Sequence, residues 1–195
     1  GRALVMLPRE GYFQIAYLIP KGSDAALRAR GLEALQRELA ELVPESTADA
    51  ITRWDDVKFL DVRLDRLRRW HGDGVLCIGD AAHAMSPAGG VGINLAIADA
   101  VAAAGLLAQP LRAHRLTTRH LAAVGRRRVL PTVATQTLQR FLHGRLLAPV
   151  LQGHDTKPPA ALLKLLQRVP QLTAIPAYLV GVGLLPQHAP DFARR

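Results

Sequence analysis

The chain has 195 residues, of which 49% are apolar, and its formal net charge is +9. This apolar fraction excludes an intrinsically disordered protein, and the length suffices for one hydrophobic core and a small second one. Because the single cysteine, Cys77, excludes an internal disulfide, we expect a protein of the reducing cytoplasm.

The N-terminal region predicts a hairpin, a helix and a returning strand. Two apolar runs, 3–7 and 12–19, flank residues 8–11, which predicts a hairpin with a four-residue loop. Leucines at helical spacing predict one helix that runs from about residue 24 to residue 42. Over 57–64 apolar and charged residues alternate, as they do in a half-exposed strand.

The next stretch carries the strongest functional signal. Residues 75–78 are apolar and predict a fully buried parallel strand, which delivers Asp80 to its carboxyl end. A glycine-rich turn follows, and then a helix of small residues from Asn94 to Ala108, which Gln109-Pro110 is expected to end. Ligands of open α/β sheets bind beyond the carboxyl ends of the strands, and a helix N-terminus offers them free N–H groups. The pattern therefore predicts a cofactor site.

One motif spans sixteen positions of this stretch. It reads Gly79-Asp80-Ala81-Ala82-His83, with Pro87, Gly89, Gly92 and Asn94 behind it. It resembles the second flavin-binding motif of the FAD-dependent aromatic hydroxylases, the single-component flavoprotein monooxygenases of the para-hydroxybenzoate hydroxylase type. The resemblance implies that Asp80 holds the ribityl hydroxyls of FAD, and that the following loop and helix start lie along the flavin ring. The cofactor-binding residues that it implies are Gly79, Asp80, Pro87, Ala88, Gly89, Gly90, Val91, Gly92, Ile93 and Asn94.

The residue types suit this chemistry. An ionised carboxylate accepts short hydrogen bonds from hydroxyls, and a helix N-terminus stabilises the negative charge of a reduced flavin. The competing interpretation is that Asp80 only caps a turn and that the glycines only make room for packing; the length of the motif favours the flavin. We predict no catalytic acid, base or nucleophile, since the flavin carries the chemistry, and we expect His83 to be structural. The histidines show no metal-ligand spacing, and no metal site is predicted.

A second glycine motif, which holds the FAD pyrophosphate in whole members of the family, has no match in this sequence. Gly90-Val91-Gly92 and Gly181-Val182-Gly183 both fail the Gly-x-Gly-x-x-Gly pattern and its context. We therefore expect the C-terminal part of a longer enzyme, which needs the missing N-terminal part for full FAD binding and is inactive in isolation.

The resemblance also implies the fold class and the domain organisation. We expect an α/β (α+β) fragment, with part of a Rossmann-like FAD/NAD(P)-binding domain, the end of a substrate-binding β-sheet domain and a helical C-terminal region. The expected boundaries are 1–70 for the end of the substrate-binding sheet domain, 71–108 for the FAD-binding segment and 109–195 for the C-terminal helical region.

The C-terminal region is predicted to be helical and is strongly basic. Helices are expected at 111–130, 131–147, 158–169 and 171–182, two of them beginning at proline. No carboxylate side chain lies between Asp99 and Asp155, and the arginines of that stretch are Arg112, Arg115, Arg119, Arg126, Arg127, Arg128, Arg140 and Arg145. We favour a solvated helix surface over nucleic-acid binding, because the aromatic side chains that stack on bases are scarce.

Residues 169–190 carry no formal charge if His188 is neutral, which raises the question of membrane contact. Prolines and glycines interrupt the stretch, whereas a membrane-spanning helix needs about 20 predominantly apolar residues. We expect packed helices there, with membrane contact that is peripheral at most.

The resemblance implies an FAD-dependent monooxygenase that hydroxylates an aromatic, conjugated or lipophilic small molecule with O2, using NAD(P)H as the transient reductant. Within flavoenzymes, the alternatives are an epoxidase, a halogenase or a reductase with the same motif. Outside them, the alternatives are a catalytically silent interaction module and a basic nucleic-acid-binding fragment.

Overall fold

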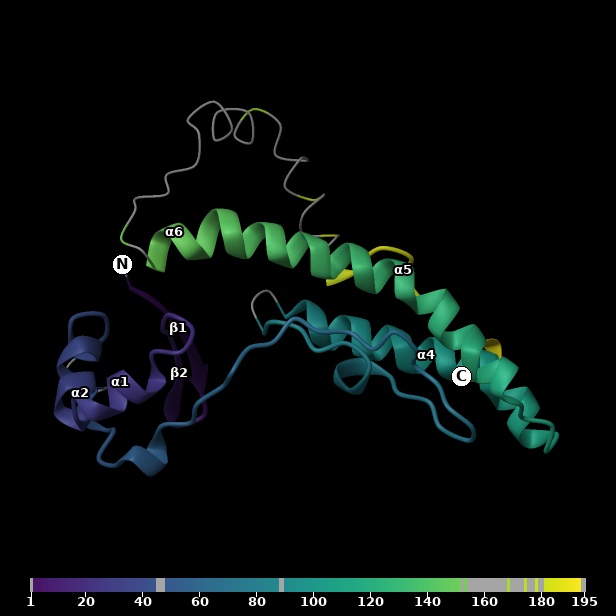
Figure 1. Cartoon of the computed structure of the whole chain (residues 1–195), viewed down its shortest axis with the longest axis horizontal. Helices are drawn as coiled ribbons and strands as arrows, with labels where there is room; N and C mark the ends of the chain where they lie inside the picture. Colours follow the sequence, from purple (N-terminus) through teal and green to yellow (C-terminus); the bar gives the residue numbers. More distant parts are fainter. Residues whose placement is uncertain are drawn as a thin grey trace. The chain divides into compact units, whose positions relative to one another are not determined.

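The structure is a computed structural model, and it describes residues 2–44, 48–87, 90–151, 153, 168, 174, 178 and 181–193 (Figure 1). The chain mixes helix and strand and divides into two compact units. The first unit comprises Gly1–Asp61 and His143–Lys157, and the second comprises Val62–Leu142 and Pro158–Arg195.

The first unit contains an antiparallel hairpin of β1 (Ala3–Arg9) and β2 (Tyr12–Leu18). Arg9 pairs with Tyr12, so the loop is the two residues Glu10-Gly11. The predicted four-residue loop is therefore wrong, because the strand pairing continues through Pro8. Gly11 has φ +78°, the left-handed conformation that so short a loop requires.

Two helices of the first unit cover one face of the hairpin. They are α1 (Asp24–Ala29) and α2 (Leu32–Ala40), where the sequence predicted one helix. Gly31, at φ 88° and ψ 162°, separates them with an extended backbone that no helix accommodates. Leu27, Leu35 and Leu39 nevertheless form the core of the unit, as expected from their spacing.

No strand forms over residues 57–64, and that prediction is wrong. The residues after the short 3₁₀ helix Trp54–Asp56 are irregular, and Phe59 and Leu60 are exposed. Alternation alone does not make a strand where no neighbouring strand supplies hydrogen bonds.

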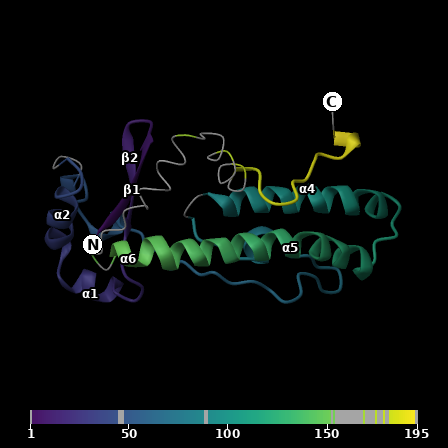
Figure 2. The same cartoon turned by 90° about the horizontal axis from the view of Figure 1, so that it is seen from above.

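The second unit is built on α4 (Val91–Arg112) and α5 (Thr118–Leu142), which pack side by side (Figure 2). Both helices continue through a proline, Pro110 or Pro131, where the sequence predicted a break. A proline inside a helix costs about 3 kcal/mol. Pro131 is fully buried, so packing offsets that cost, and Pro110 lies in the last turn of its helix, where little helix follows it.

The remaining described helical segments are short. A π-helical turn (His143–Leu147) and α6 (Ala148–Leu151) follow α5 in the sequence, and a 3₁₀ turn, Asp191–Ala193, lies near the C-terminus. The predicted helix 158–169 and most of the predicted helix 171–182 lie outside the described residues.

Residues 64–86 of the second unit form an irregular antiparallel loop rather than a strand. The Leu67 N–H donates to the Ala82 carbonyl at 2.8 Å, and the Cys77 N–H donates to the Trp70 carbonyl at 2.7 Å. The predicted buried parallel strand at 75–78 is wrong: Val75 is 57% exposed, and no parallel neighbour exists within the described part of the chain. A parallel strand needs such neighbours on both sides.

Among the described residues, α4 is the one helix that is long and apolar enough to cross a membrane. Length and composition do not separate a membrane span from the core helix of a folded domain. Here the middle of the helix carries Asp99, which is fully buried and pairs with Arg128 of α5. That contact is typical of a helix packed inside a protein.

Candidate functional site

Asp80 lies in a 3₁₀ turn, Gly79–Ala81, that interrupts the loop before α4. Its side chain is exposed, and it forms no hydrogen bond or ion pair with any residue that the structure describes. Gly79, just before it, has φ +57°, and a Cβ there would lie 3.1 Å from the Cβ of Ala96 on α4. The turn therefore packs against α4 and leaves its carboxylate accessible.

The N-terminus of α4 is the second part of the site. It begins after Gly90, which is left-handed at φ 66°, and no side chain caps it. The first turn contains no acidic residue, and its N–H groups have no acceptor within the helix. Ile93 is 70% exposed, so this end of the helix is open. Such an end carries partial positive charge and favours an anionic or electron-rich ligand.

A buried carboxylate joins these two parts. Asp99, two turns into α4, accepts a hydrogen bond from the Gly79 N–H at 3.1 Å and lies 2.6 Å from Nε2 of His83, both through Oδ2. Its Oδ1 accepts from Nε of Arg128 on α5 at 2.7 Å. All three side chains, His83, Asp99 and Arg128, are buried. The turn that carries Asp80 is thereby attached to both helices.

The charge of Asp99 follows from these contacts. Burial raises the pKa of the Asp99 carboxyl, but the hydrogen bonds from His83, Arg128 and the Gly79 amide outweigh it. The net effect holds the pKa below its ordinary value of 3.8. Asp99 is therefore ionised at neutral pH and accepts hydrogen bonds at both oxygens.

Two glutamines of α5 hold the loop on either side of the Asp80 turn. Nε2 of Gln136 donates to the Asp65 and Ala84 carbonyls at 2.8 and 3.2 Å, and Nε2 of Gln139 donates to the Ser86 carbonyl at 3.0 Å. These bonds fix the backbone that enters and leaves the site.

The sequence contains a signal for this network that the predictions above do not use. The buried polar side chains of α5 recur at helical spacing on one face: Arg128, Thr132, Thr135, Gln136 and Gln139. Polar residues on the inner face of a helix need partners, and here the partners are a loop and a carboxylate. Arg128 was predicted to be part of a solvated surface, which is wrong, because it is 1% exposed.

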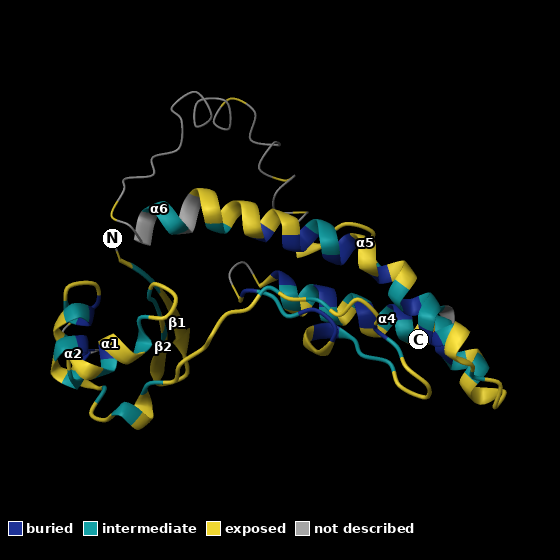
Figure 3. Cartoon of the chain, in the orientation of Figure 1, coloured by how far each residue is buried: buried dark blue, intermediate teal, exposed yellow. Residues whose placement is uncertain are grey.

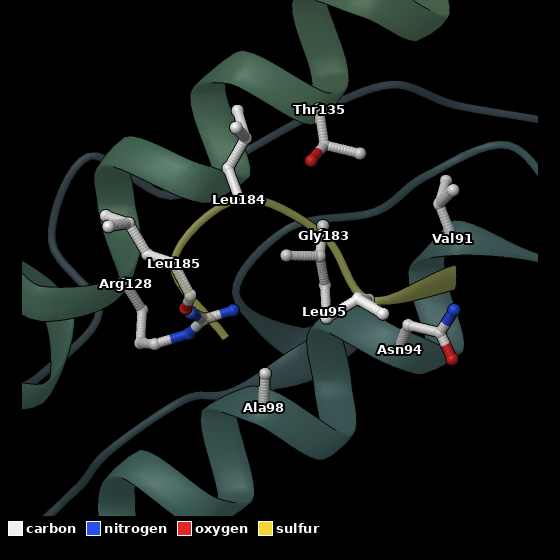
Figure 4. A pocket seen from close by; sticks show the side chains of 10 residues that line it. Val91, Asn94, Leu95, Ala98, Arg128, Thr135, Gly183, Leu184 and Leu185 are labelled. Atoms are coloured by element: carbon white, nitrogen blue, oxygen red, sulfur yellow. The ribbon is translucent and has the colours of Figure 1, made fainter. Parts of the chain in front are cut away.

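A small pocket lies between α4, α5 and the segment 182–185 (Figure 4). Asn94 and Arg128 line it, and the Leu185 carbonyl accepts a long hydrogen bond, 3.5 Å, from Nη1 of Arg128. Its free volume is about 10 Å³, room for about one water molecule. It is too small for a flavin, so the candidate site consists of the exposed Asp80 and the open start of α4 rather than this pocket.

Two of the predicted site residues lie where the loop packs against α4. Gly79 lies against Ala96, and a Cβ on Gly92 would lie 3.6 Å from the Cβ of Met85. Gly79 and Val91 are buried, Gly92 and Asn94 are half-buried, and Asp80, Pro87, Gly90 and Ile93 are exposed. Ala88 and Gly89 lie outside the described residues. His83 is buried against Asp99 and the Trp70 ring, which agrees with a structural role.

Comparison with known proteins decides the family. A sequence model of the FAD binding domain family matches residues 1–140. The chain belongs to the FAD-dependent aromatic hydroxylase family. A curated relative, 6-methylpretetramide 4-monooxygenase of Streptomyces rimosus, is 38% identical over 153 residues. The match covers 77% of this chain and 37% of that monooxygenase, so the chain spans well under half the length of the curated relative.

Proposed function

We propose that this chain forms the part of an FAD-dependent monooxygenase that binds the ribityl chain and the ring end of FAD. The observation that carries the proposal is that Asp80, an exposed carboxylate without a partner among the described residues, lies in a turn that packs against α4, whose N-terminus no side chain caps. The groups present fit FAD: ribityl hydroxyls need an acceptor, which Asp80 supplies, and the electron-rich edge of the flavin needs N–H donors, which the first turn of α4 supplies without an acidic residue of its own.

Each group has a separate task in this proposal. Asp80 accepts from the ribityl hydroxyls, while the backbone N–H groups of Gly92 and Ile93, in the first turn of α4, face the pyrimidine edge. The loop from Pro87 to Gly90 lies along the ring. When bound, FAD supplies the oxygen-activating chemistry. The chain orients the cofactor and helps to exclude water, and none of its residues is proposed as an acid, base or nucleophile.

The reaction that we propose is hydroxylation of an aromatic, conjugated or lipophilic small molecule by O2, with NAD(P)H as the transient reductant. The family membership and the monooxygenase relative support the reaction class. We place the enzyme in the cytoplasm, with no nucleic-acid partner and at most peripheral membrane contact.

The domain organisation is part of the same proposal. Residues 1–70 end a substrate-binding sheet domain, 71–108 form the FAD-binding segment of a Rossmann-like domain, and 109–195 form the helical region. Exposed Val5, Leu7 and Tyr12 on the hairpin support a larger sheet. A further part of the enzyme supplies the pyrophosphate and adenosine subsites, so the 195-residue chain alone binds FAD weakly and shows little turnover.

The test is an FAD titration of the chain and of the longer enzyme that contains it, followed by flavin fluorescence. Asp80→Ala lowers FAD affinity by about ten-fold or more, the effect of one or two lost charge-assisted hydrogen bonds. Asp55→Ala is the matched control, because Asp55 is also an exposed carboxylate in the middle of a 3₁₀ turn. Equal affinity of the Asp80 and Asp55 variants would refute the proposal.

A further inference from the structure

We propose that Asp99 is a positioning residue of the flavin site: it sets the position of the Asp80 turn relative to the N-terminus of α4. The inference rests on the proposed function, because it assigns a residue that acts on FAD through Asp80. It concerns a side chain that is buried and does not itself touch the cofactor.

The first step of the argument is the attachment of the turn at both ends. The Gly79 N–H and Nε2 of His83 both contact the same oxygen, Oδ2 of Asp99. Gly79 begins the 3₁₀ turn and His83 follows it by two residues. Asp80 lies between these two anchors, so the position of its carboxylate depends on the position of Asp99.

The second step is that Asp99 belongs to the helix whose N-terminus completes the site. It lies eight residues after Val91, the first residue of α4, which corresponds to about 12 Å along the helix axis. Close packing supports the same contact, since a Cβ on Gly79 would come within 3.1 Å of Ala96. One rigid helix therefore carries both the N–H donors and the anchor of the acceptor.

The third step concerns the charge. Nε of Arg128 donates to the other oxygen, Oδ1, and this charge-assisted bond leaves Oδ2 free to serve the turn. A buried ion pair of this kind contributes little net stability compared with an apolar contact of the same size. Its directional hydrogen bonds define one geometry of the turn, which apolar packing would define less sharply.

The competing explanation is that the network stabilises the fold and has no effect on the site. The two explanations differ in how the effects of substitutions at Asp99 and Asp80 on FAD affinity combine. If Asp99 acts through Asp80, the effects of Asp99→Asn and Asp80→Ala on FAD affinity are not additive, because the second substitution removes a group that the first has already misplaced. If Asp99 only stabilises the fold, the affinity of the folded protein is unchanged.

The experiment is a double-mutant cycle in FAD affinity on the FAD-binding enzyme that contains this chain, read by the flavin absorption band and by fluorescence. We expect Asp99→Asn to weaken FAD binding about ten-fold, in line with the loss of a hydrogen bond to a charged group. The same variant in the Asp80→Ala background is expected to lose less than about three-fold more. Glu38→Gln is the matched control, a carboxylate that pairs with Arg30 and Tyr17 in the first unit.

A second variant covers the case in which Asp99→Asn does not fold. His83→Leu removes one contact to Oδ2 and keeps the Asp99–Arg128 pair, whereas His83→Gln provides an amide N–H that can replace Nε2. We expect FAD binding to be weaker in His83→Leu, with an effect that is not additive with that of Asp80→Ala. In His83→Gln we expect FAD affinity close to that of the wild type.

The possible outcomes separate the two proposals. Additive effects at Asp99 and Asp80, or unchanged FAD affinity in folded Asp99→Asn or His83→Leu, would overturn the positioning role and leave the flavin site standing. If Asp80→Ala binds FAD as tightly as the wild type, the proposed function is overturned, and this inference is overturned with it.

Discussion

Among the described residues, the buried interior of the first unit is made of leucine, valine and alanine, whereas that of the second unit also contains a histidine, an aspartate, an arginine and glutamines. Figure 3 shows the buried stretches of the described chain in dark blue. Apolar contacts are not directional, but hydrogen bonds are. The second unit can therefore hold an irregular loop, residues 64–86, in one conformation without a sheet. The comparison shows that the polar interior occurs where a backbone turn carries the candidate cofactor site.

The largest loss of stability is expected from a substitution that disrupts the polar interior of the second unit. Arg128→Ala leaves Asp99 buried without its cationic partner, and loss of one member of a buried ion pair costs about 3–5 kcal/mol. Amide hydrogen exchange of α4 and α5 measures the loss. Arg127→Ala is the control, because Arg127 is exposed and contacts only Gln187 among the described residues; it is expected to change stability by less than about 0.5 kcal/mol. Similar losses in both variants would contradict the comparison.

A smaller effect is expected in the apolar interior. Leu35, at 2% exposure, is one of the most buried side chains in the core of the first unit. Leu35→Ala creates a cavity and costs about 3 kcal/mol. Hydrogen exchange is expected to rise in α1, α2 and the hairpin. Protection of the Gly79 and His83 amides is expected to stay as in the wild type, and a matching loss there would show that the two interiors unfold together.

The smallest expected effect is a loss of folding stability at low pH. The pKa of Asp99 is lowered, since its hydrogen bonds outweigh burial, and the pKa of Glu38 is lowered below 4.5 in the same way, mainly by Arg30 against burial. A lowered pKa means that stability is complete above the ordinary value and is lost as the pH falls through the folded value. Urea denaturation at pH 7, 4 and 3 is expected to show a loss that begins near pH 4.

Two variants divide this acid loss between the units. Asp99→Asn removes the contribution of Asp99 in the second unit, and Glu38→Gln removes the contribution of Glu38 in the first. If neither substitution flattens the pH profile, other carboxylates are responsible for the acid lability.

Local patterns predicted the local features of the chain. The hairpin, the leucine face that forms the first core and the helix that starts after the glycine-rich turn are confirmed. Family membership, which the motif at Gly79-Asp80 indicated, is also confirmed. The binding roles of the individual motif residues stay predictions.

Other features depend on contacts that no local pattern contains. Pro131 does not break α5 because tertiary packing surrounds it, and residues 75–78 do not form a strand because no parallel neighbour is present in the described residues. Asp99 and Arg128 are 29 residues apart, and nothing in their own neighbourhoods marks them as partners.

The sequence by itself determined which residue types surround the candidate site: an aspartate in a tight turn and a glycine-rich start of a helix. Only the tertiary structure decided that the aspartate stays exposed and that a second, buried aspartate holds its turn. The physical reason is the distance along the chain over which the deciding interactions act. Backbone conformation and helical periodicity depend on neighbours within a few residues, whereas burial and the pairing of buried charges depend on which distant segments the fold brings together.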